Sequence, residues 1–265
     1  MPPKGGPKRL THFLCIPLVT PTSRLQLQKS LQAFCSDVKD DRTPKNPNGI
    51  PEKAIRPLGT LHLTLGVMSL LTSERVEGAL ALLRSLDIPS LLSVPSTASA
   101  LATSAKEPGP AAAATPQPLK ITLRGLKSMH PPSETSVLYS SPVDPDGRLY
   151  TFCNSLRAAF SDFLVPDDRP LLLHATIVNT VYVPGVRERS GGQAGAGHGK
   201  QKAKMTIDAR EVLERYEETV WMEECKVEKV AIFRMGARKV RDKEGRETGE
   251  EVYVVEGEVE FPVVE

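Results

Sequence analysis

The chain has 265 residues, of which 40% are hydrophobic and 25% charged, and it carries a formal net charge of +2. This length allows one large domain or two closely packed lobes with a substantial core. The small net charge argues against nucleic-acid binding by bulk electrostatics, so any affinity for phosphate must be local. The sequence contains no run of eighteen apolar residues, which excludes a membrane-spanning helix.

Four cysteines stand singly in the sequence, at positions 15, 35, 153 and 225. They have neither the C-x-x-C spacing of a zinc site nor the density of a secreted disulfide scaffold. We therefore expect reduced, mostly buried thiols and an intracellular protein, in the nucleus, the cytoplasm or both.

The first half of the chain reads as strand, helix, strand, helix. Residues 1–9 predict a flexible N-terminus, and residues 10–19 predict a strand rather than a signal peptide, because His12 and Pro17 interrupt the apolar run. The apolar residues of 23–38 fit one helical stripe, formed by Leu25, Leu27, Leu31 and Phe34. Residues 60–71 predict a second strand, and residues 73–86 an amphipathic helix with Ser73 as its N-cap.

Between two irregular segments, the second half broadly echoes this pattern with the order strand, strand, helix, strand. Residues 88–118 are rich in Pro, Ala and Ser, and residues 185–204 are rich in Gly and Lys, so both predict flexible insertions in a single two-lobed domain over 10–265. Between them we expect two strands at 119–129 and 136–143, a helix over 146–164 and a strand over 171–179.

The last third predicts a helix over 207–218 with Asp208 near its start, a strand over 225–236, a charged hairpin loop over 241–251 and a final strand over 252–261. Because strands often follow strands through short turns, the sequence predicts an α+β fold with mainly antiparallel sheets.

Two H-x-T tripeptides carry the chemistry. His62-Leu63-Thr64 and His174-Ala175-Thr176 both lie in apolar strands, where alternation places His and Thr on one face and the intervening residues in the core. A titratable ring in such a strand is costly unless it is hydrogen-bonded or lines a cleft. The alternative is two core histidines that donate to backbone carbonyls, with Thr present as a strand former. The repetition of the motif favours a functional pair.

Other motifs in the sequence point less clearly to function. Metal chemistry has little support, since neither HExxH nor a Cys/His cluster occurs. The stretch 197–201 is not a phosphate loop, because Gln201 stands where Ser or Thr should hold magnesium. Tyr139, Tyr182 and Arg124 are candidate substrate contacts, although packing or a solvated face explains each of them equally well.

The paired motifs resemble the signature of the two-histidine phosphoesterase superfamily, which has an H-x-[ST] motif in each of two pseudo-symmetric lobes. The segment HLTLGVMSLLTSERVEGALALLRSL is similar to the first motif and following helix of the A-kinase anchoring protein branch. The segment LHATIVNT is similar to the second motif of the activating signal cointegrator complex subunit. The resemblance covers nearly all of residues 10–262, apart from the two irregular segments.

This resemblance implies a bilobal fold of two pseudo-symmetric, mainly antiparallel sheets flanked by helices, with His62 and His174 facing each other across a central cleft. One neutral imidazole would act as base and the other, protonated, as acid, while Thr64 and Thr176 would donate hydrogen bonds to the phosphate oxygens. It implies no cofactor or metal. The implied substrates are RNA ends and cyclic or 2′,5′-linked nucleotide phosphodiesters.

Two other functions stay open at this point. The same cleft in a non-catalytic subunit would bind RNA or nucleotide within a transcription-coactivator or repair complex. A 2′,5′ RNA ligase would share the fold and join ends rather than cleave them. The sequence does not determine the substrate or the oligomeric state. It also does not determine which histidine is the acid and which is the base.

Overall fold

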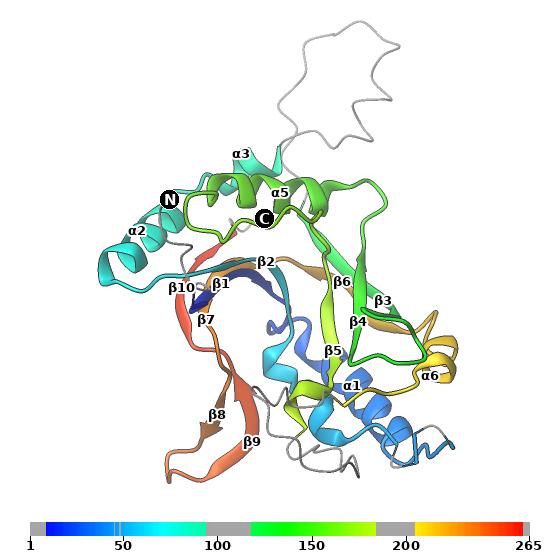
Figure 1. Cartoon of the computed structure of the whole chain (residues 1–265). Helices are drawn as coiled ribbons and strands as arrows, with labels where there is room; N and C mark the ends of the chain where they lie inside the picture. Colours follow the sequence, from blue (N-terminus) through cyan, green and yellow to red (C-terminus); the bar gives the residue numbers. More distant parts are fainter. Residues whose placement is uncertain (1–8, 45, 48, 94–117, 184–204, 262–265) are drawn as a thin grey trace, which may run out of the picture.

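Two four-stranded antiparallel sheets form the body of the protein, shown in Figure 1. The structure is a computed structural model that describes residues 9–44, 46–47, 49–93, 118–183 and 205–261. Most of the predicted N-terminal tail (1–9), most of the predicted insertion at 88–118 and all of the one at 185–204 lie outside the described residues. The α+β class with antiparallel sheets is confirmed.

The first sheet has the strand order β10-β7-β1-β2. Its strands are β1 (His12–Pro17), β2 (His62–Met68), β7 (Lys229–Arg234) and β10 (Val255–Glu260). The second sheet has the order β5-β4-β3-β6, with β3 (Lys120–Ser128), β4 (Val137–Val143), β5 (Ala175–Asn179) and β6 (Val220–Lys226). Each sheet forms one lobe of the protein. The H-x-T strands β2 and β5 are each an edge strand of their sheet, so neither has a neighbouring strand on its outer side.

Both motif strands carry a β-bulge immediately after the motif threonine. On β2, Thr64 pairs with Cys15 while Gly66 pairs with Leu14, so Leu65 is the additional residue. On β5 the register shifts in the same way, because Thr176 pairs with Tyr139 while Val178 pairs with Leu138. A bulge bends its strand and redirects the neighbouring side chains. This shared irregularity is direct evidence for the predicted pseudo-symmetry.

The helices lie against the two sheets, and a small hairpin extends from the first sheet (Figure 1). The helices are α1 (Arg24–Val38), α2 (Ser73–Arg84), α3 (Ile88–Leu92), α5 (Arg148–Ala159) and α6 (Arg210–Arg215). Short 3-10 turns occur at η1 (Glu52–Ala54), η2 (Leu58–Thr60) and η3 (Thr180–Tyr182). The hairpin consists of β8 (Arg238–Arg241) and β9 (Glu247–Val252).

The predicted faces of the motif strands are confirmed by burial. Leu61, Leu63 and Leu65 are at most 3% exposed, and Ala175 and Ile177 are fully buried. These apolar side chains join one large core, whereas the opposite face of the first sheet carries a smaller apolar cluster of Phe13, Cys15, Ala231 and Phe233. All four cysteines are unpaired, as expected, and three of them are buried.

Several predicted helix details are wrong at the ends of elements. Thr72, not Ser73, is the N-cap of α2, because its hydroxyl accepts a hydrogen bond from the backbone N–H of Arg75. Leu25 is exposed, and Val38 takes its place in the buried stripe of α1. The irregular segment expected from residue 88 begins with the short helix α3, which buries Ile88.

The predicted strand over 225–236 is confirmed from Lys229 to Arg234 (β7), but its first two residues belong to β6. The chain leaves the second sheet at Lys226 and enters the first at Lys229, so one apolar run serves two sheets. Likewise, the expected charged loop over 241–251 forms most of the β8–β9 hairpin. Local alternation cannot reveal a change of sheet, because both strands bury residues of the same kind.

Candidate functional site

His62 is held in one tautomer by the backbone of the 3-10 turn that precedes its strand. Its Nδ1 lies 2.7 Å from the carbonyl oxygen of Thr60. Because a carbonyl only accepts hydrogen bonds, Nδ1 must carry a proton. The other ring nitrogen, Nε2, lies 3.0 Å from the Thr64 hydroxyl, which donates to it when the ring is neutral. The motif spacing therefore joins the histidine to its threonine directly.

Burial keeps the His62 ring neutral. Desolvation lowers the pKa of His62 to about 4, against a smaller opposing effect of the hydrogen bond to Thr60. The His174 ring and the Arg56 guanidinium lower this pKa further through their charge, so both lie within electrostatic reach of His62. The rings of Phe13 and Tyr253 pack against it, with centroids at 4.8 and 5.3 Å.

His174 repeats this arrangement in the other lobe. It immediately precedes β5, and its Nδ1 lies 2.8 Å from the carbonyl oxygen of Leu172, again the residue two positions before the histidine. The same argument assigns its proton to Nδ1 and leaves Nε2 available to a ligand. Tyr139 packs edge-on against the ring, with a centroid distance of 5.5 Å.

The two lobes meet where the segment before β2 attaches to β5. The backbone N–H of Arg56 donates to the carbonyl of Ile177 at 2.8 Å, and Ile55 forms an antiparallel bridge with Val178. A small cavity of about 190 Å³ opens at this junction, lined by Arg56, Thr60, His62, Thr176, Asn179, Tyr182 and Tyr253. One motif residue from each lobe thus faces the same space.

A family model for the AKAP7 2′5′ RNA ligase-like domain matches residues 10–244. The chain belongs to this family. It is thereby a member of the two-histidine phosphoesterase superfamily, in the branch that the sequence indicated. No match was found among curated proteins.

Three solved structures resemble the chain over nearly its whole length. A phosphoesterase is 15% identical, with 95% of this chain and 97% of that chain covered and a TM-score of 0.46. The protein TT0787 of Thermus thermophilus is 15% identical, with 94% of this chain and 97% of that chain covered and a TM-score of 0.48. E. coli LigT complexed with 3′-AMP is 16% identical, covering 95% and 97%, with a TM-score of 0.47. Similarity this distant does not extend to activity or ligand.

In this member of the family, the residues predicted to contact substrate have different positions. Tyr182 lines the cavity between the lobes. Tyr139 is 8% exposed and packs on His174 instead of lining that cavity. Arg124 is exposed, and its Nε lies 3.7 Å from Oε2 of Glu218 in an ion pair. It is not among the residues that line the cavity.

Sequence reasoning missed Arg56, Asn179 and Tyr253. Arg56 is only 6% exposed, and its guanidinium carbon lies 3.7 Å from the centroid of the Tyr182 ring. Tyr253 follows the β8–β9 hairpin, which was expected to be a loop. Asn179 ends the second motif strand. Simple alternation from Thr176 would place Asn179 on the core face, and only the bulge brings it to the face of the histidine.

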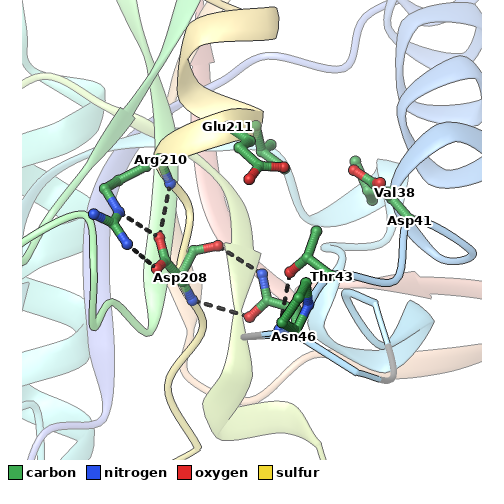
Figure 2. A pocket seen from close by; sticks show the side chains of 9 residues that line it. Val38, Asp41, Thr43, Asn46, Asp208, Arg210 and Glu211 are labelled. Carbon is green, nitrogen blue, oxygen red and sulfur yellow. Dashed lines mark hydrogen bonds and ion pairs between the residues drawn. The ribbon is translucent and has the colours of Figure 1, made fainter.

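A larger cavity of about 450 Å³ lies apart from the histidines, between the end of α1 and the start of α6 (Figure 2). Several of the polar groups that line it already have protein partners. Asn46 exchanges two hydrogen bonds with the backbone of Asp208, whose carboxylate pairs with Arg210. Asp41 pairs with Arg215. This cavity has no histidine or cysteine among its described lining residues, and we assign it no chemistry.

Within the described parts of the chain, no group of three or more His, Cys, Asp or Glu side chains is placed to hold a metal ion. In those same parts, no helix has the length and hydropathy needed to cross a bilayer.

Proposed function

We propose that the chain is a metal-independent phosphodiesterase that acts on RNA ends or on cyclic or 2′,5′-linked nucleotide phosphodiesters. The observation that carries this proposal is the matched restraint of two imidazoles, each with Nδ1 on the carbonyl two residues before it, in lobes joined beside a common cavity. Two core histidines without a function would not need this repeated geometry or the bulges that follow it.

The environment of His62 suggests how the two rings divide the work. Since burial holds His62 neutral at pH 7, its Nε2 is the base that takes the proton from the attacking water. A bond then forms between the water oxygen and phosphorus, and the bond from phosphorus to the leaving oxygen breaks. His174, in its protonated form, delivers a proton from Nε2 to that oxygen.

The two threonines stabilise the charge that develops on the phosphorus centre. Thr176 lines the cavity, and Thr64 is hydrogen-bonded to Nε2 of His62 in the resting site. Both hydroxyls would donate to the non-bridging oxygens, where negative charge accumulates. A proton passes from His62 to His174 through solvent between turnovers, which restores the starting state.

The experiment incubates purified protein, with EDTA present, on a 2′,3′-cyclic nucleotide and on short RNAs. We expect His62→Ala and His174→Ala each to lower the rate by about 10² to 10⁴ fold, the usual contribution of one acid or base. His130→Ala, a change at an exposed histidine, serves as the matched control and should leave the rate unchanged.

Each outcome separates the candidate functions. Equal product from wild type and both motif variants would refute the two-histidine mechanism. Tight RNA binding without cleavage would favour the non-catalytic nucleotide-binding subunit. Joined rather than cleaved RNA would identify a ligase. Turnover that EDTA abolishes would refute metal independence.

A further inference from the structure

Arg56 is a buried cation without a counter-ion in the part of the chain that the structure describes. Its side chain is 6% exposed, yet no carboxylate lies within ion-pair distance. One terminal nitrogen, Nη2, is fully buried and has no hydrogen-bond partner. Leaving a charged donor buried and unsatisfied costs several kcal/mol in proteins generally. An anion bound beside Arg56 would satisfy both its charge and this donor.

The neighbours of Arg56 hold it in place without neutralising it. The backbone N–H of Arg56 donates a hydrogen bond to the carbonyl oxygen of Ile177 at 2.8 Å. Its guanidinium lies over the ring of Tyr182 in a cation-π contact. The contact with Tyr182 covers one face of the guanidinium and leaves N–H groups at its edge for a ligand. Tyr253 also interacts with Arg56 but does not neutralise it, since a phenol is uncharged at pH 7 and burial raises the pKa of Tyr253 further.

The rest of the cavity has the same preference for an anion. None of the seven described residues that line it is an Asp or Glu, whereas Asn179, Thr176 and the two tyrosines offer N–H or O–H groups. The Thr60 hydroxyl is already committed to the Pro57 carbonyl at 2.7 Å. A planar guanidinium among such donors matches the oxygens of a phosphate or carboxylate group. Because His62 and Thr176 line the same small space, the ligand must lie at the reacting centre.

We propose that Arg56 is a catalytic residue whose guanidinium binds the non-bridging oxygens of the reacting phosphate group. This inference rests on the proposed function for its catalytic part, but its binding part stands on the cavity alone. The substrate phosphate supplies the missing counter-ion, and the arginine adds a full positive charge to the neutral donors of the two H-x-T motifs. Its contribution grows as negative charge develops on those oxygens in the transition state.

The first test is binding of inorganic phosphate, followed by isothermal calorimetry or NMR. Arg56→Met keeps an unbranched apolar stem and removes the charge, and we expect it to weaken phosphate binding by about 10- to 100-fold, as the loss of a charge-assisted hydrogen bond does. Arg84→Met, which removes the same charge at an exposed position in α2, is the control and should bind as the wild type does. Phosphate affinity that is equal in wild type, Arg56→Met and Arg84→Met would overturn the proposal.

Thermal denaturation separates this role from a purely structural one. Replacing an unpaired buried charge by an apolar group is neutral or stabilising in general. Without phosphate, Arg56→Met should therefore melt no lower than the wild type, and phosphate should raise the melting temperatures of the wild type and Arg84→Met more than that of Arg56→Met. A variant that melts lower but still gains stability from phosphate as the wild type does would assign Arg56 to packing with Tyr182 and refute the proposal.

Two further measurements cover a failure of Arg56→Met to fold. Arg56→Lys keeps the charge but loses the planar edge, and we expect intermediate phosphate binding. In the wild type, the NMR resonance of the Arg56 Nε–H should shift when phosphate is added. A resonance that does not shift would count against the contact. If no substrate is turned over but phosphate binding still depends on Arg56, the proposed function fails and the anion site remains. If turnover occurs and Arg56→Met retains it fully, the catalytic role fails alone.

Discussion

Acidification should destabilise this fold through His62, whose imidazole is largely desolvated. The pKa of His62 is lowered from 6.5 to about 4, chiefly by burial, so the unfolded chain binds a proton more readily than the folded protein does. Folding stability from this group is therefore complete above about pH 6.5 and is lost as the pH falls towards 4. Between pH 6.5 and pH 4 the unfolded state binds more protons than the folded state, because the pKa of His62 is lower in the folded protein. Lowering the pH therefore favours unfolding.

The size of the effect follows from the two pKa values. At pH 4.5 the unfolded histidine is protonated about a hundredfold over its neutral form, whereas the folded one is still mostly neutral. The corresponding loss is about 2 kcal/mol relative to pH 7, a sizeable part of the stability of an ordinary domain.

The assay is urea denaturation of wild type and His62→Gln at pH 7 and pH 4.5. Ionisable groups that do not interact with His62 are the same in both proteins, so their effects cancel in the difference. We expect the wild type to lose about 2 kcal/mol more than the variant on acidification. His130→Gln should lose as much as the wild type, because His130 is exposed. If wild type and His62→Gln weaken in parallel, the ring is not held neutral by burial and the base assigned above is wrong.

Three further predictions test the site and its supports. Thr176→Val should lower kcat on a cleaved diester by about 10² to 10³ fold, as the loss of one oxyanion donor does, whereas Thr176→Ser should keep most of the rate. Gly59→Ala should displace the hairpin that borders the cavity and lower activity more than stability, since an added Cβ would lie 2.6 Å from the Glu251 carbonyl oxygen; an unchanged rate would show that the hairpin has no part in the site. Thr72→Ala should cost about 1 kcal/mol of unfolding free energy and Ser73→Ala much less, measured by thermal unfolding, and equal losses would contradict the cap seen at Thr72.

The sequence alone determined the parts of the site that depend on short-range geometry. The period of two residues along a strand is fixed by the backbone, so the two H-x-T motifs predicted both the core faces and the pairing of each His with its Thr on one face. Leu63 and Ala175, one inside each motif, are fully buried as that period requires. The family, too, was readable from these motifs, and the family model confirms it.

Only the tertiary structure decided which distant residues join the histidines. Arg56 stands in a stretch without regular periodicity, and its importance comes from burial beside β5 and contact with Tyr182. Tyr253 reaches His62 because an apparent loop forms a hairpin, and the chain changes sheets between Lys226 and Lys229 within one apolar run. Burial and missing counter-ions are properties of the packed molecule: they depend on neighbours that lie far away in the sequence, so no local pattern encodes them.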